Sequence, residues 1–198
     1  MDLESYLYEK VLPVIQSWED ENIYAISFFV YYNELNEYNG YSNFPEFTIC
    51  YNTENNCNHA PQLSEERWNF AFWEQDTIPI IEPENNGNSA NEGAKVLFDW
   101  YKENGIENIG FEDEDAMYDE EMNYIGKGPV GYYELLCVVS NVARRLQIEG
   151  KISAQFGNIP IIVHDYEYPW YIEEATKNAN PNGEATTFLK AWKQGFPE

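Results

Sequence analysis

Apolar side chains recur every three or four residues in two long stretches of the chain, 3–18 and 130–149, and this period predicts amphipathic helices. Pro13 lies inside the first stretch and predicts a kink there. The second stretch has the more regular apolar seam, which consists of Leu135, Val139, Val142 and Leu146. Gly150 follows this stretch and predicts the end of its helix.

Capping residues predict shorter helices elsewhere. Ser64 is followed by two acidic residues and then by an aromatic segment, which is typical of a helix start. Ser89 is expected to cap a helix that ends at Gly105. Two further helices are expected over residues 170–178 and 184–192.

Dense runs of Ile, Val, Phe and Tyr predict strands, which we place at residues 23–32, 46–51, 78–81 and 159–166. Asn, Gly and Ser are frequent in 33–44, which is expected to be a long polar loop, and 52–62 is expected to be another polar loop. The order of helices and strands lacks the regular alternation of a doubly wound sheet, and no repeat or Gly/Ser linker divides the 198 residues. We therefore predict a single α+β domain over 1–198, with one mixed or antiparallel sheet flanked by helices.

Composition narrows the class of partner. Aromatic residues make up 17% of the chain, so we expect an aromatic core that includes Trp68 and Trp73. There are 35 acidic and 11 basic residues, which gives a net charge of −24. Such a charge repels phosphate backbones and anionic membranes, and it favours a basic protein partner. The alternative is that the acidity serves only solubility.

Three features predict a cytoplasmic location. No stretch approaches the roughly 18 apolar residues of a membrane span, and the acidic start lacks the layout of a signal peptide. The three cysteines, Cys50, Cys57 and Cys137, form an odd and sparse set that is typical of reduced thiols.

No cofactor or metal site is predicted. The chain lacks the glycine patterns of dinucleotide and Walker loops, and the glycine-rich segment 126–131 is interpreted as a turn that enters a helix. The segment that begins at Asp113 does not match a calcium-binding loop, because Tyr118 and Tyr124 occupy the positions where an EF-hand needs Gly and Glu. Cys50, Cys57 and His59 are close in sequence but lack a fourth zinc ligand.

No catalytic residue is predicted either. Only two histidines are present, and no nucleophile elbow is found. His164 and Asp165 are neighbours in an expected strand, so their side chains should point to opposite faces. An enzyme with a pocket lined by carboxylates and aromatic rings stays open as an alternative, because the chain has many acids to choose from.

The segment 107–124 is the candidate partner-binding site. Eight of its residues are acidic, and like charges this close repel one another unless a partner neutralises them. Apolar side chains such as Phe111 and Met122 lie between the acids and offer anchors for a partner. The predicted contact residues are Glu112, Asp113, Glu114, Asp115, Tyr118, Asp119, Glu120 and Glu121. The alternative is a solvated loop whose aromatic side chains fold back onto the core.

Several segments resemble a known family. These are YAISF at 24–28, RWNFAFW at 67–73, ARRLQIEG at 143–150 and NANP at 178–181, together with the strand IPIIVHDYEY. With them, the chain resembles the bacterial family known as domain of unknown function 4303 over nearly its whole length. The resemblance implies a cytosolic immunity-type protein that binds and blocks a toxin, and it carries over no catalytic residue. The expected function is thus neutralisation of a basic toxin or nuclease domain, and the alternatives are an orphan enzyme and a scaffold or regulatory domain.

Overall fold

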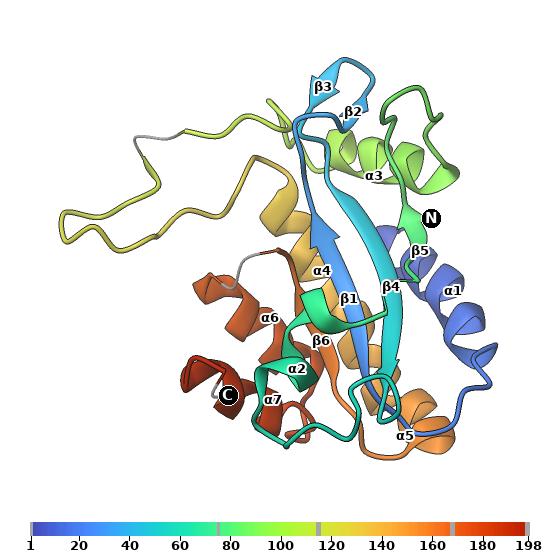
Figure 1. Ribbon diagram of the computed structural model, residues 1–198. Coiled ribbons are helices and arrows are strands. Elements are labelled where there is room, and N and C mark those ends of the chain that lie inside the picture. Colours follow the sequence, from blue (N-terminus) through green and yellow to red (C-terminus); the bar gives the residue numbers. More distant parts are fainter. Residues whose placement is uncertain (1, 75, 114–115, 167–168, 197–198) are drawn as a thin grey trace.

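The computed structural model describes residues 2–74, 76–113, 116–166 and 169–196 (Figure 1). Within them the chain forms one α+β domain around a four-stranded sheet of order β5-β4-β1-β6, which confirms the predicted class. The strands are β1 (Ile23–Tyr31), β4 (Glu46–Thr53), β5 (Ile78–Ile81) and β6 (Ile161–His164). The sheet is mixed, because β1 pairs antiparallel with β4 and parallel with β6, and β4 pairs antiparallel with β5.

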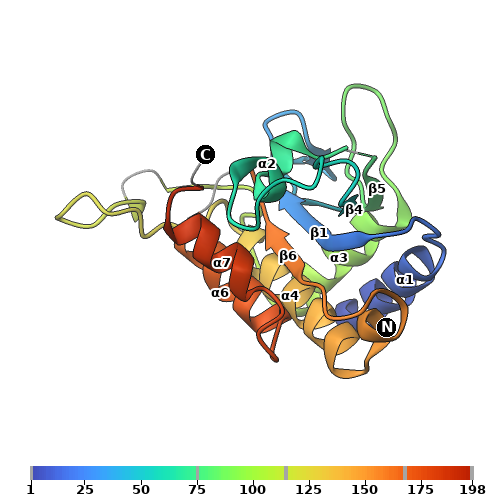
Figure 2. The ribbon, with the colours of Figure 1, turned by 60° about the horizontal axis from the view of Figure 1, so that its bottom comes forward.

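Helices cover both faces of the sheet, and Figure 2 shows α2 on one side with α3 and α4 on the other. The helices against the larger part of the core are α1 (Leu3–Gln16), α3 (Glu92–Glu103), α4 (Tyr132–Ile148), α5 (Lys151–Phe156) and α6 (Trp170–Ala179). The elements on the opposite face are α2 (Glu65–Trp68), the short 3-10 helix η1 (Phe70–Phe72) and α7 (Thr186–Lys193). Successive side chains of β1 point to opposite faces of the sheet, so the strand contributes to both layers of the core. Phe28 belongs to the larger cluster and Phe29 to the smaller one.

The smaller layer contains the two tryptophans expected in the core. Trp68 and Trp73 are 4% and 5% exposed, so that prediction is confirmed. Both rings meet the Tyr24 ring edge-on. No helix in the described part of the chain has the length and the apolar character that a membrane crossing requires.

Several boundaries differ from the prediction. The N-cap of α3 is Asn91 and not Ser89, and its side chain accepts a hydrogen bond of 3.2 Å from the Ala94 N–H. Ser64 stands at the N-cap of α2, but its side chain makes no capping bond. The expected loop 33–44 contains a small hairpin of β2 (Glu37–Tyr38) and β3 (Tyr41–Ser42). Helix α4 does end before Gly150, but α5, which was not predicted, begins directly after it.

The strand β6 lies at the edge of the sheet, and side chains from the α6 region bond its outer backbone groups. The Asn180 amide accepts from the Ile161 N–H (2.9 Å) and donates to the Ile161 carbonyl (2.7 Å). The Thr176 hydroxyl accepts from the Val163 N–H (3.2 Å) and donates to the Val163 carbonyl (2.9 Å). These bonds close the edge that would otherwise be free to pair with another strand.

Candidate functional site

The acidic segment forms a projecting arm, which we define as residues 111–129. The arm leaves the body after α3 and returns to it at α4 (Figure 1). Its two limbs are joined at the root, where the Gly110 N–H donates to the Val130 carbonyl and the Val130 N–H donates to the Phe111 carbonyl, each at 2.9 Å. The segment is therefore an extended excursion from the domain.

The outer part of the arm has a turn of its own. Tyr118 and Tyr124 form an isolated antiparallel bridge, and their rings meet edge-on at 5.7 Å. The Asp119 carboxylate accepts hydrogen bonds from the Asn123 backbone N–H (2.7 Å) and side-chain amide (3.0 Å). These bonds, led by that of the side-chain amide, lower the pKa of Asp119, so this carboxylate stays charged in the turn.

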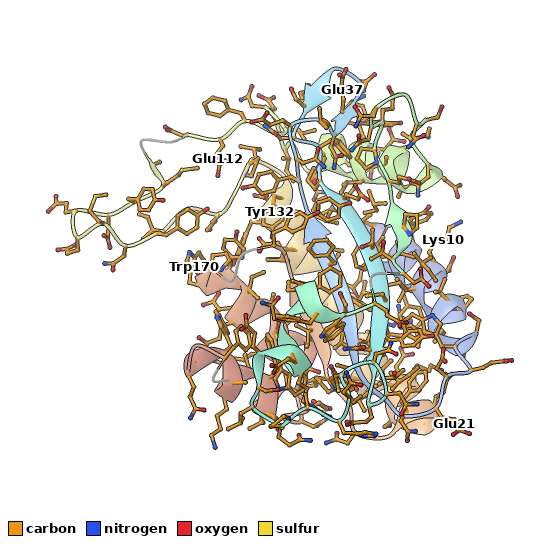
Figure 3. All side chains as sticks on the ribbon, in the orientation of Figure 1. Lys10, Glu21, Glu37, Glu112, Tyr132 and Trp170 are labelled. Atoms are coloured by element: carbon orange, nitrogen blue, oxygen red, sulfur yellow. The ribbon has the colours of Figure 1, made fainter. Side chains whose placement is uncertain are left out.

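Close packing fixes the root of the arm. Gly110 has a φ of +79°, and a Cβ placed there would lie 1.8 Å from the Ser42 carbonyl oxygen, so this position requires glycine. On the other limb the Trp170 indole N–H donates to the Gly126 carbonyl at 3.2 Å. In Figure 3, Glu112 and Tyr132 lie near the root and Trp170 lies beside the returning limb.

The predicted contact residues differ in their exposure. The exposed ones are Asp113, Tyr118, Glu120 and Glu121. Glu112 and Asp119 are partly buried. Glu114 and Asp115 lie outside the described residues. The structure thus places six of the eight on one arm, two of them less accessible than the sequence implied.

Apolar side chains on the arm divide into two groups. Tyr124 packs against the core, as the alternative of a folded-back loop expects. Phe111, Tyr118 and Met122 are instead 61%, 50% and 74% exposed. Ile125 is also 50% exposed. Large exposed apolar side chains within a charged field are typical of a contact surface for another protein.

A buried cluster of tyrosines and carboxylates lies beneath the root. Asp165, which follows β6, accepts hydrogen bonds from the Tyr132 hydroxyl (2.6 Å) and the Tyr171 hydroxyl (3.3 Å). Burial, followed by the charge of Glu112, raises the pKa of Tyr32 to about 12. The sequence did not identify this cluster, although an acid at the end of a buried strand is a signal that a partner is needed.

His164 faces the other side of the sheet, as predicted from the alternation of strand side chains. Its Nε2 lies 2.7 Å from the Ser27 Oγ, and its Nδ1 lies 3.1 Å from the Asp165 carbonyl. Burial lowers the pKa of His164 to about 4. This pair has the spacing of a nucleophile and its base, but it lies beneath the rings of Phe29 and Phe70 and is at most 1% exposed. A substrate has no path to Ser27 in this arrangement.

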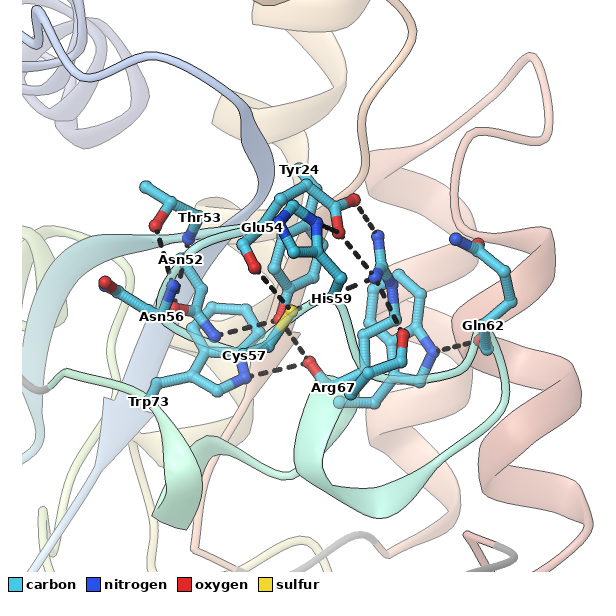
Figure 4. A network of polar contacts seen from close by, with 12 residues as sticks. Tyr24, Asn52, Thr53, Glu54, Asn56, Cys57, His59, Gln62, Arg67 and Trp73 are labelled. Atoms are coloured by element: carbon cyan, nitrogen blue, oxygen red, sulfur yellow. Dashed lines mark hydrogen bonds and ion pairs between the residues drawn. The ribbon is translucent and has the colours of Figure 1, made fainter.

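Two of the three residues considered for zinc, Cys57 and His59, belong to a different network, shown in Figure 4. Cys57 donates to the Glu54 carbonyl at 3.5 Å, and its sulfur lies 3.8 Å from the Arg67 Nη1. Both carboxylate oxygens of Glu54 accept from the Arg67 guanidinium, and His59 lies 3.8 Å from one of them. Among the described residues, no group of three or more His, Cys, Asp or Glu side chains is arranged to hold a metal ion.

The glycine-rich segment before α4 behaves as the predicted helix entry. Gly131 takes a left-handed conformation with a φ of 96°, and its N–H donates to the Glu134 carboxylate at 3.1 Å. A carboxylate therefore already occupies the start of this helix, where a phosphate would otherwise bind.

Comparisons with known proteins give no relative for this chain. No protein-family model matches it, and neither a curated protein nor a solved structure is significantly similar to it. The resemblance to domain of unknown function 4303 therefore stays a prediction, and any function must rest on the residues themselves.

Proposed function

We propose that this chain is a binding protein that captures a basic protein through the arm, in an inhibitory complex of the immunity type. One observation carries the proposal: exposed acids and exposed large apolar side chains share a projecting turn. Glu120 and Glu121 supply negative charge beside Met122, which is 74% exposed. Interfaces are commonly built from such apolar anchors within a field of complementary charge.

Electrostatics favour this class of partner over others. The arm carries seven acidic residues and one basic residue, Lys127. A basic surface brought against these acids removes their mutual repulsion and is attracted over a long range, so the encounter is fast at low salt. Phosphate groups would instead be repelled, which argues against a nucleic acid at the same surface.

The exposed tip allows a direct test. We would replace Asp113, Glu120 and Glu121 by Asn, Gln and Gln, and compare this variant with one in which Glu9, Glu19 and Glu103 become Gln. Both variants lose three charges, and all six side chains are exposed, so both should fold. Only the first variant changes the proposed contact surface.

The measurement is capture of proteins from a lysate of the source cells, at low and then at high salt. We expect a basic protein that the wild type and the body variant retain at low salt, that high salt weakens, and that the arm variant loses. Equal retention by both variants would rule out the arm as the interface. If no specific protein is retained at either salt, the proposal of a basic protein partner fails and the enzyme alternative gains weight.

Inhibition is tested separately once a partner is found. Co-expression with that partner should protect cells when the wild type or the body variant is present. Loss of protection with the arm variant is the expected result. Protection that persists although binding is lost would show that inhibition does not run through the arm.

A further inference from the structure

An open hollow lies between the loop 54–62 and the α2–η1 segment, on the opposite sheet face from the larger core layer. Its volume is about 490 Å³, which is within the roughly 300–1,000 Å³ that small-molecule sites occupy. The side chains used below to argue for a ligand are Asn56, Asn58, Glu66 and Phe72, all of which line it. The hollow shares none of these residues with the arm.

The wall of the hollow is held in place by the Arg67 network. The Arg67 side chain is 4% exposed, and its guanidinium bonds both Glu54 oxygens and the Ala60 carbonyl, the last at 3.2 Å. It also lies over the Tyr24 ring at 4.2 Å. The positive charge of Arg67 is therefore neutralised by Glu54 and lies behind the wall, so it does not set the charge of the hollow.

The groups that face the hollow suit an organic cation. Glu66 is exposed and takes part in none of the ion pairs among the described residues. Phe72 is 53% exposed and presents an aromatic ring at the rim. A carboxylate and an aromatic ring together attract a guanidinium or ammonium group, and the ring also covers the alkyl stem that carries it. The amide oxygens of Asn56 and Asn58 add further acceptors.

The wall of the hollow also contains a buried hydroxyl, that of Ser64. Ser64 is 3% exposed, and its Oγ has no hydrogen-bond partner among the described residues. Although Ser64 holds the N-cap position of α2, it makes no capping bond there. A buried hydroxyl without a partner is costly, and this cost belongs to the wall itself, because the Oγ lies below the surface that a ligand in the hollow would touch.

We propose that the hollow binds a guanidinium group on an alkyl stem, as in an arginine side chain. Glu66 accepts from the guanidinium, Phe72 covers the stem, and the amide oxygens of Asn56 and Asn58 accept further N–H groups. The charge of the chain, −24, favours the entry of a cation. The site is separate from the arm, and it does not depend on the proposed function.

The test is a titration of the ¹⁵N-labelled protein with N-acetyl-L-arginine amide, followed by NMR. N-acetyl-L-citrulline amide is the matched probe, because it has a similar shape but lacks the positive charge. We expect shifts confined to the Asn56 and Asn58 side-chain amides and the backbone around Phe72, with a Kd on the order of millimolar for so small a ligand. The citrulline probe should bind at least about tenfold more weakly, since it cannot form a charge-assisted bond.

Variants locate the site. Glu66→Gln should weaken binding of the arginine probe by about tenfold, whereas Glu103→Gln, which removes the same charge far away in sequence, should leave the Kd unchanged. Both side chains are exposed, so folding is not at risk. Equal binding of the citrulline probe, an unchanged Kd in Glu66→Gln, or shifts outside the hollow would each overturn the proposal.

Free L-arginine distinguishes the two sources of such a group. If the blocked probe binds as tightly as free arginine, the site takes an arginine side chain of a protein. If only free arginine binds, the site takes the free amino acid. If neither binds, the proposal is wrong, and this result leaves the proposed role of the arm untouched.

Discussion

The outer edge of β6 depends on the Asn180 side chain, and replacing it by Ala tests whether this bond arrangement holds the sheet. All four hydrogen-bonding positions of the amide are used. Its oxygen accepts from the Ile161 N–H (2.9 Å) and the Gln147 side chain (3.1 Å). Its nitrogen donates to the carbonyls of Ile161 (2.7 Å) and Thr176 (2.8 Å). Asn180 is 5% exposed, so water does not share these bonds.

The expected loss follows from the backbone groups left behind. Asn180→Ala removes the partners of the Ile161 N–H and C=O at a residue that is fully buried. Each unsatisfied buried group costs about 1–3 kcal/mol, so the two together cost about 2–6 kcal/mol. Local relaxation at the edge reduces this, and we expect a loss of about 3 kcal/mol in the free energy of unfolding.

Asn178→Ala is the matched control, two residues earlier. The Asn178 amide donates two bonds, to the Ser140 hydroxyl (2.6 Å) and the Asn141 side chain (2.9 Å), but it is partly exposed and bonds no backbone group of the sheet. Water can replace these bonds, so the loss should stay below about 1 kcal/mol. Urea unfolding of the two variants and the wild type gives both values.

Hydrogen exchange adds a local readout. In Asn180→Ala the Ile161 amide should exchange at least about tenfold faster relative to the Val163 amide, which keeps its bond to Thr176. A cost for Asn180→Ala no larger than that for Asn178→Ala, with Ile161 still protected, would refute the reasoning. It would mean that the β6 edge is satisfied without this side chain.

Two further predictions concern titratable groups. Burial lowers the pKa of His164 to about 4, below its ordinary 6.5. As the pH falls, the imidazole is therefore protonated in the unfolded chain before it is protonated in the folded protein. The folded state therefore loses stability as the pH falls from about 6.5 to 4, by about 3 kcal/mol in total, and urea midpoints of His164→Gln should lack this part of the pH dependence. Cys137 is exposed whereas Cys50 and Cys57 are buried, and burial raises the pKa of the Cys50 thiol to about 12. A thiol-reactive dye should thus label one cysteine rapidly in the native protein and all three after unfolding.

Long apolar periods located the major helices well. Helices α1 and α4 begin and end within two residues of the predicted ranges, because each apolar seam is buried in the larger core cluster over several turns. Helix α5 was missed, since its six residues are too few to display a period. Its start depends on Gly150, whose left-handed φ of 69° ends one helix and admits the next.

The cap of α3 shows why local signals mislead. Ser89 and Asn91 are both good capping residues, and the sequence alone does not rank them. Asn91 is the cap because its amide also accepts from the Glu82 N–H at 3.1 Å and donates to the Ile80 carbonyl at 3.4 Å. These bonds reach β5 and the chain after it, so the choice is made by tertiary contacts.

The same limit applies to the candidate sites. Charge identified the segment 107–124, but not that it projects, because the bond between Phe111 and Val130 joins residues that are 19 apart. The hollow had no sequence signal at all. Its wall depends on the pairing of Arg67 with Glu54, and nothing in the sequence indicates that these two residues pair.

The positions of the ion pairs indicate that charges on the arm can be removed without loss of folding stability. Among the described residues, the ion pairs lie outside the arm, for example between Lys10 and Glu92 (3.0 Å), and Glu120 and Glu121 take part in none of them. Removing the charges of these two residues therefore breaks no ion pair of the fold and relieves some repulsion. A variant with only Glu120→Gln and Glu121→Gln should be as stable as the wild type or slightly more stable, so a loss of partner binding in it cannot be attributed to unfolding.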